Sequence, residues 1–214
     1  MITVLNSNIK SIADNEIEKY TKLLPESMQK NIQRYRHPPD KKFRLISRLM
    51  LLSILKKENK VHLINNWEED QNRKPFIKDW YYFNISHSGE QVTFVYSTNI
   101  IGIDIEKIQE DMDYSEILKN FQDKEQAYIL NSQNPIHSFY EIWVKKEATL
   151  KAMGYGILNG LKEFNCMGNE IEQDNKKWFL TPVTISNNYM CYISSSASEK
   201  DYHLIPFSLE ELIH

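Results

Sequence analysis

One short stretch, Gly102-Ile103-Asp104-Ile105-Glu106, constrains the fold of this chain more than any other. Its β-branched residues are typical of a strand, and in a strand Asp104 and Glu106 point to the same face. Isoleucines at positions 101, 103 and 105 occupy the opposite face, so one side of this strand is predicted to be buried. The two acids therefore line the other side together.

A second stretch, residues 143–151, carries a complementary set of charges on a long helical pattern. Glu147 and Lys151 share a face because they are four residues apart. If this helix packs beside the strand, three carboxylates and one ammonium converge. Oxygen ligands in small number suit Mg²⁺ that is also held by substrate phosphates, and a neighbouring lysine suits a phosphate.

Each half of this pattern also has an ordinary explanation. A Glu-Lys pair at this spacing is common on solvated helix faces. A strand with alternate acids is common at the polar face of a sheet edge. The metal-and-phosphate interpretation depends on the two stretches lying together.

Composition restricts the class of protein. The 214 residues are enough for one compact unit or two small lobes, and a hydrophobic fraction of 41% supports a sizeable core. No apolar run is long enough to span a membrane, and the first residues lack a secretory signal pattern. With only Cys166 and Cys191, we expect a reduced, cytoplasmic protein without a disulfide framework.

Charge divides the chain into two unlike halves. Residues 1–100 hold 16 Lys and Arg against 11 Asp and Glu, a net charge of +5, whereas the remainder has a net charge of −8. The segment 30–48 is the most basic, and it favours either a solvated surface or a phosphate-rich ligand. Nucleic acid is not expected as a partner, because the whole chain is acidic and the basic region is small.

The periodicity of the sequence predicts an α+β fold. We expect helices over residues 14–24, 26–35, 41–57, 114–121, 123–130 and 135–153, with Asp40 as the N-cap of the third and Gly154 ending the last. We expect strands over residues 2–5, 61–67, 80–85, 92–96, 100–105, 164–167, 178–185, 189–193 and 202–207. This order occurs twice, so we predict two similar lobes, 1–99 and 100–214, related by a pseudo-twofold axis with a ligand between them.

Three further spots could face a polyphosphate. Ser86-His87-Ser88 follows a predicted strand, Arg73-Lys74-Pro75 forms a rigid turn, and Arg44 lies on the long basic helix. Each could equally be an ordinary strand end, loop or solvated surface. Ser86 and His87 cannot form a nucleophile and base with each other, since neighbours in an extended backbone point apart. No phosphate-binding loop of the GxxxxGK[ST] type is present.

In combination, these motifs are familiar. Asn84-Ile85-Ser86-His87-Ser88, the Gly102–Glu106 stretch, and the pattern of Trp143, Lys146-Glu147-Ala148, Lys151 and Gly154 occur in order. The chain thereby resembles the 4′-phosphopantetheinyl transferases, of the two-lobed monomeric type that primes nonribosomal peptide and polyketide synthetases. The resemblance covers nearly the whole chain.

This resemblance implies a role for each matching residue. Asp104, Glu106 and Glu147 would hold Mg²⁺, and Lys151 would contact the pyrophosphate of coenzyme A. Ser86 and His87 would contact its phosphates, and Lys74 its nucleotide end together with Arg73, Lys30 and Arg44. Glu147, Lys151 and His87 form the implied catalytic set. The segment from Ile108 to Phe121 would dock an acyl or peptidyl carrier protein, and the enzyme would act as a monomer without a membrane.

Three positions depart from the family pattern. Arg73 stands where glycine is common, Gln122 where a small residue is usual, and Ser27 where close relatives have lysine. These departures affect the nucleotide end more than the metal site. Two other classes stay open: a different Mg²⁺-dependent pyrophosphate-cleaving enzyme, and a non-catalytic carrier-binding module of the same fold.

Overall fold

The computed structural model describes residues 1–155 and 160–212. Its first sheet has the strand order β10-β1-β5-β4. β1 (Ile2–Asn8) pairs antiparallel with β5 (Gln91–Ser97), and β5 pairs antiparallel with β4 (Tyr82–Ser88). The last strand of the chain, β10 (Tyr202–Pro206), joins β1 in parallel. Residues from the two ends of the chain thus share one sheet.

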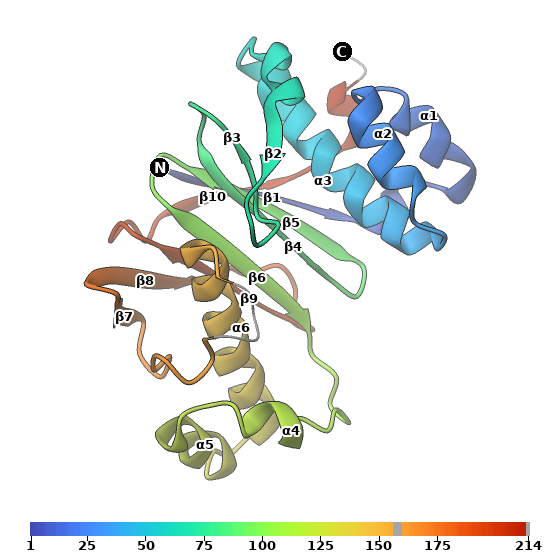
Figure 1. Cartoon of the computed structure of the whole chain (residues 1–214). Helices are drawn as coiled ribbons and strands as arrows, with labels where there is room; N and C mark the ends of the chain where they lie inside the picture. The colour runs from blue at the N-terminus through green and yellow to red at the C-terminus, as the bar shows by residue number, and fades with distance from the viewer. Residues whose placement is uncertain (156–159, 213–214) are drawn as a thin grey trace.

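Three helices cover one face of this sheet: α1 (Ile17–Thr21), α2 (Glu26–Gln33) and α3 (Pro38–Lys57). Figure 1 shows them grouped together above the strands. α3 is the long central helix, and its apolar face packs on the sheet in a core that also contains Phe83 and Phe94. Short 3-10 turns, η1 (Ile9–Ser11), η2 (Asp14–Glu16) and η3 (Val61–Asn66), connect these elements, and η5 (Leu209–Leu212) packs against the same core.

The second sheet has the order β6-β9-β8-β7, with every pairing antiparallel. Its strands are β6 (Ile101–Lys107), β9 (Tyr189–Ser195), β8 (Lys176–Pro182) and β7 (Glu170–Gln173). The long helix α6 (Pro135–Met153) lies across this sheet. The short helices α4 (Ser115–Leu118) and α5 (Asp123–Leu130) lie beside the N-terminal end of α6 (Figure 1).

Gly102 sets the distance between α6 and β6. A Cβ atom at this position would collide with the backbone oxygen of Ala148 and the backbone nitrogen of Ala152. Only a residue without a side chain permits this approach of helix to strand. The close approach brings the C-terminal half of α6, with Glu147 and Lys151, directly against β6.

The α+β class with two lobes is confirmed. Each lobe has a four-stranded sheet and one long helix with proline in its first turn, Pro38 in α3 and Pro135 in α6. The two sheets meet in a shared core that contains Val4, Val95, Ile103 and Ile193. The predicted division at 99/100 does not describe the end of the chain, because residues 202–212 return to the first lobe.

Several expected elements differ in the structure. Residues 61–66 form a 3-10 helix instead of a strand, with the Leu63 N–H bonded to the Lys60 carbonyl three residues earlier. Residues 164–167 form no strand, because charged side chains take up the Phe164 carbonyl and the Cys166 N–H. His37, not Asp40, is the N-cap of α3. The short strands β2 (Trp67–Glu69), β3 (Pro75–Ile77) and β7 were not expected.

The predicted end of the last long helix is confirmed. Gly154 ends α6 in the left-handed conformation, with φ of 76°. None of the helices within the described ranges is both long and apolar enough to cross a lipid bilayer.

Candidate active site

The site is built where the edge strands of the two sheets, β4 and β6, run side by side in the same direction. Side chains of β4 bridge them, by accepting hydrogen bonds from alternate backbone N–H groups of β6. The bonds join Ile103 N–H to Asn84 Oδ1 (3.0 Å), Ile105 N–H to Ser86 Oγ (3.4 Å) and Lys107 N–H to Ser88 Oγ (3.0 Å). Because strand side chains alternate, all three bridging residues face β6 together.

The same serines also hold the two acids of β6. Ser86 Oγ donates to Asp104 Oδ1 at 2.8 Å, and Ser88 Oγ donates to Glu106 Oε2 at 2.6 Å. The Lys151 ammonium reaches across from α6 and donates to Asp104 Oδ1 at 2.5 Å and to Ser86 Oγ at 3.0 Å. Strand β4, strand β6 and helix α6 thus meet at one point.

Glu147 completes this cluster from α6. Its Oε2 atom lies 3.8 Å from Lys151 Nζ, and both Glu147 and Asp104 are buried. Burial raises the pKa of Glu147 to about 8, and the carboxylate of Asp104 adds to the shift. Burial likewise raises the pKa of Glu106, again with Asp104 contributing.

The pKa of Lys151 is also raised, but for a different reason. Burial alone would lower its pKa, but the carboxylates of Asp104 and Glu147 outweigh that effect and raise it. The ammonium therefore stays charged among acids that are crowded enough to resist full ionisation.

The cluster offers only part of what a divalent cation requires. Within residues 1–155 and 160–212, no three carboxyl, imidazole or thiol groups form a ready-made metal site. However, Asp104 Oδ2 is buried without a hydrogen-bond partner. Mg²⁺ commonly takes one or two carboxylates and completes its shell with water and substrate phosphates. The donor set fits a cation that arrives with a phosphorylated substrate.

His87 and Arg44 lie on the other side of β4. The His87 ring stacks on Phe43 of α3, with centroids 4.1 Å apart, and burial followed by the charges of Lys151 and Arg44 lowers its pKa. The Arg44 guanidinium lies 3.5 Å above the ring centroid of Tyr35. These two basic groups share a neighbourhood, and His87 points away from Ser86, as the strand alternation predicts.

Lys30 lies apart from this group in the structure. It is exposed on α2 and forms an ion pair with Glu26 one turn earlier, at 2.7 Å. This is the solvated pairing expected of an i,i+4 surface pair.

Arg73 and Lys74 lie in the turn between β2 and β3. Arg73 is exposed and adopts the left-handed conformation, with φ of 64°, which explains why glycine suits this position. Lys74 Nζ donates to the carbonyl oxygens of Ala152 (3.0 Å) and Ile101 (3.3 Å). Burial lowers its pKa to about 8, although Asp70 opposes the shift. Lys74 therefore holds the turn against α6 and β6 in this structure.

Two cavities flank Lys74. One of about 310 Å³ is lined by residues of the predicted phosphate side, including Arg73, Lys74, Asn84 and Lys151. The other, of about 460 Å³, is lined by aromatic residues that include Trp80 and Tyr82, and none of the three acids borders it. The three acids do not line the smaller cavity either, and it borders the charged cluster only at Lys151.

The predicted carrier-docking segment packs partly on its own lobe. Leu118 and Phe121 are buried in the core beside α6, and Tyr114 stacks on Phe139 with centroids 4.6 Å apart. Ile108, Met112 and Ile117 are only partly buried against the same core. These three keep surface that a partner could contact.

The sequence indicated Ser88 only as part of a strand end that could face a polyphosphate, and it indicated no role for Asn84. In the structure they bridge the two sheets, and Ser88 holds Glu106. The signal was available, because polar residues at positions 84, 86 and 88 alternate with the apolar Phe83 and Ile85.

Two family models match consecutive parts of the chain. Residues 12–99 match the model described as 4′-phosphopantetheinyl transferase, N-terminal, and residues 100–204 match the 4′-phosphopantetheinyl transferase superfamily. The chain therefore belongs to the 4′-phosphopantetheinyl transferase superfamily, and the enzyme class predicted from its motifs is confirmed.

Individual relatives agree with this placement. The chain is 35% identical to the 4′-phosphopantetheinyl transferase gsp of Aneurinibacillus migulanus over 66% of its own length and 59% of that protein. It is 23% identical to the 4′-phosphopantetheinyl transferase Sfp of Bacillus subtilis, over 91% and 86% of the two chains. A third similarity, 32% identity over 54% of this chain, is to 6% of the fatty acid synthase subunit alpha of Candida parapsilosis. The aligned region spans less than two thirds of the gsp protein and most of Sfp.

Proposed function

We propose that this protein transfers 4′-phosphopantetheine from coenzyme A to a serine of an apo carrier protein and releases adenosine 3′,5′-bisphosphate. The observation that carries the proposal is the cluster of Asp104, Glu147 and Lys151 where the two lobes meet. A cavity of about 310 Å³ that borders Lys151 gives a phosphorylated ligand access to it. Family membership supplies the reaction class.

Asp104, Glu106 and Glu147 would hold Mg²⁺. The unpartnered Oδ2 atom of Asp104 and the raised pKa values of Glu106 and Glu147 support this assignment, because a cation would relieve the repulsion among the acids. When bound, Mg²⁺ would neutralise charge on the pyrophosphate and stabilise the leaving phosphate.

Glu147 is the group that would take the proton of the carrier serine. Burial raises the pKa of Glu147 to about 8, so its ionised form is a stronger base than the carboxylate of an ordinary glutamate. The serine oxygen would attack the phosphorus that bears the pantetheine arm. The bond between this attacked phosphorus and the bridging oxygen would break, and the nucleotide would leave with the bridging oxygen and its electron pair.

Basic groups would bind the phosphates of coenzyme A. Lys151, with Ser86 beside it, would contact the pyrophosphate, and His87 would contact the phosphates from the other side of β4; both groups would add electrostatic stabilisation as charge develops. Arg44 shares the neighbourhood of His87, and Arg73 and Lys74 border the cavity. Lys74 would have to exchange its two carbonyl partners for a phosphate, and Lys30 would have to leave Glu26.

The partner would be an acyl or peptidyl carrier protein, docked on the Ile108–Phe121 segment. We further propose that the enzyme is a cytoplasmic monomer that binds no nucleic acid and no membrane. The alternatives are a Mg²⁺-dependent enzyme that cleaves a pyrophosphate without a carrier, and a carrier-binding module without activity.

One experiment separates these functions. The protein is incubated with coenzyme A, Mg²⁺ and several apo carriers, and the carrier mass is measured. A gain of one phosphopantetheine is expected for the transferase. Cleavage of coenzyme A without carrier modification would support the first alternative, and carrier binding without a mass change the second.

Glu147→Gln tests the assigned chemistry. This variant should retain the fold and bind coenzyme A but lose transfer. Transfer at the wild-type rate would remove Glu147 from the mechanism.

A further inference from the structure

A second charged cluster lies on the other side of α6 from the active site. It is centred on Glu125 of α5 and Lys146 of α6, whose Oε2 and Nζ atoms are 2.9 Å apart. Both side chains have no solvent exposure. Lys146 immediately precedes Glu147, so successive residues of one helix serve two different clusters.

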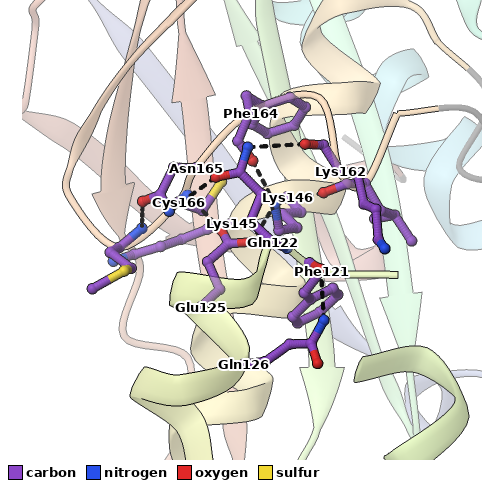
Figure 2. Close-up of polar contacts among 12 residues, drawn as sticks. Phe121, Gln122, Glu125, Gln126, Lys145, Lys146, Lys162, Phe164, Asn165 and Cys166 are labelled. Atoms are coloured by element: carbon purple, nitrogen blue, oxygen red, sulfur yellow. Dashed lines mark hydrogen bonds and ion pairs between the residues drawn. The ribbon is translucent and has the colours of Figure 1, made fainter. Parts of the chain in front are cut away.

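The Lys146 ammonium has three acceptors, and both carboxylate oxygens of Glu125 accept hydrogen bonds. Lys146 Nζ also donates to the carbonyl oxygens of Leu161 (2.7 Å) and Phe164 (2.6 Å). Glu125 accepts from the backbone N–H groups of Cys166 (2.7 Å) and Gln122 (3.0 Å). Figure 2 shows these groups turned toward one another between α5, α6 and the segment that contains Phe164.

Aromatic rings enclose the cation. The centroids of Phe121 and Phe164 lie 5.5 and 4.9 Å from Lys146 Nζ. Gln122 adds further bonds to the same segment, donating to the Lys162 carbonyl at 2.9 Å and accepting from Asn165 Nδ2 at 3.3 Å. The longer side chain at position 122 thus strengthens the link that the ion pair makes.

Stability alone does not account for such a pair. The desolvation of two buried charges offsets much of their attraction, and well-packed apolar replacements are often as stable. The pair instead fixes the positions of nearby segments, because each of its hydrogen bonds holds one backbone group in place. The fixed groups belong to the start of α5 and to residues 161–166. Through the ion pair, all of them are held in place relative to α6.

The start of α5 directly follows the predicted docking segment, Ile108–Phe121. Helix α6 itself is already fixed on β6 by the close approach at Gly102. Loss of the ion pair would therefore displace the docking segment and leave the cluster of Asp104, Glu147 and Lys151 in place.

We propose that Glu125 and Lys146 are positioning residues that hold the carrier-docking segment in register with α6, so that the carrier serine is delivered to Glu147. This inference rests on the proposed function. It assigns the pair to the carrier half of the reaction and not to coenzyme A binding.

Lys146→Met tests the proposal, and Lys145→Met is its matched control. Lys145 is equally buried on the same helix, but it pairs with Glu141 of α6 (2.6 Å) and lies 5.1 Å from the Tyr192 ring centroid, away from α5. For Lys146→Met we expect kcat/KM for the carrier to fall about 100-fold, the cost of a displacement near 1 Å. The dissociation constant for coenzyme A should match that of Lys145→Met.

Hydrogen exchange gives a readout independent of turnover. Amides of residues 115–130 and 161–166 should exchange faster in Lys146→Met than in Lys145→Met, whereas those of β6 should not differ. Equal carrier kinetics in the two variants would overturn the proposal.

If Lys146→Met does not fold, the double variant Glu125→Leu/Lys146→Met replaces it, since it removes the bonds that fix the two segments and leaves no unpaired buried charge. Wild-type carrier kinetics in a folded double variant would likewise overturn the proposal. The wild-type protein separates a failure of this proposal from a failure of the proposed function. If the wild-type protein modifies no carrier, it is the proposed function that is overturned.

Discussion

Ser86 and Asp104 come from different sheets, yet the Ser86 hydroxyl donates to Asp104 Oδ1 at 2.8 Å and accepts from the Lys151 ammonium at 3.0 Å. One small side chain therefore links the two lobes and orients an acid and a base of the candidate site. Two residues further along each strand, Ser88 and Glu106 repeat the arrangement at 2.6 Å.

The pair of Ser88 and Glu106 allows the first prediction. The Ser88 hydroxyl orients Glu106 and lowers the pKa of this carboxyl group. Ser88→Ala removes both effects, so Mg²⁺ binding should weaken. A hydrogen bond to a charged group contributes about 1.5–3 kcal/mol, so we expect kcat/KM to fall roughly tenfold or more. Titration of activity and of Mg²⁺ binding by calorimetry would measure this.

Ser88→Thr is the control, because it keeps the hydroxyl and should stay near wild type. A Ser88→Ala enzyme with unchanged Mg²⁺ dependence would show that Glu106 does not need this partner.

Gly102→Ala should destabilise the protein. The added methyl group would overlap the backbone of α6 at Ala148 and Ala152, and backbone cannot move aside as a side chain does. Overpacking of this kind costs about 1–3 kcal/mol or more. Urea denaturation would measure the loss, with Gly168→Ala for comparison, since a Cβ there meets its nearest atom at 3.8 Å. Equal stability of the two variants would contradict the close approach.

Arg73 is expected to lower the stability of the protein and to strengthen its binding of coenzyme A. Its left-handed backbone is unfavourable for a residue with a side chain by about 1 kcal/mol, so Arg73→Gly should raise the unfolding midpoint. The same change removes a cation from the cavity, so coenzyme A should bind more weakly and with less salt dependence. Arg73→Lys keeps both the charge and the backbone cost, and should change neither property. If Arg73→Gly binds coenzyme A as tightly as wild type, Arg73 does not contact the ligand.

Lys74 predicts a dependence of stability on pH. In the folded protein the pKa of the Lys74 ammonium is about 8, whereas in the unfolded chain it is about 10.5. The unfolded state thus binds more protons between these values, and the free energy of unfolding gains a contribution that rises with pH across that range. Lys74→Met should lack this contribution. Parallel unfolding curves for the two proteins at pH 8 and pH 10 would show that the amine is not perturbed.

The main architecture was predictable because its signals are local. The spacing of acids in β6, the period of α6 and the left-handed Gly154 can be read from neighbouring residues. The confirmed enzyme class follows from motifs whose residues the fold brings together at one junction.

The missed features depend on partners distant in sequence. Residues 164–167 have the composition of a strand, but their backbone groups bond to Lys146 and Glu125, which no local pattern reveals. Lys74 shows the same limit. Its sequence context indicates a phosphate ligand, whereas its ammonium lies against two carbonyl groups.

The parallel pairing of β10 with β1 has a consequence for how the chain acquires its shape. Strand β1 leaves the ribosome well before β10, its outer neighbour in the sheet, has been synthesised. Until then one edge of β1 remains open to any other extended segment. A fragment cut at residue 99 would keep that edge permanently, so dissecting this enzyme into its halves should yield a self-associating first half rather than an independent lobe.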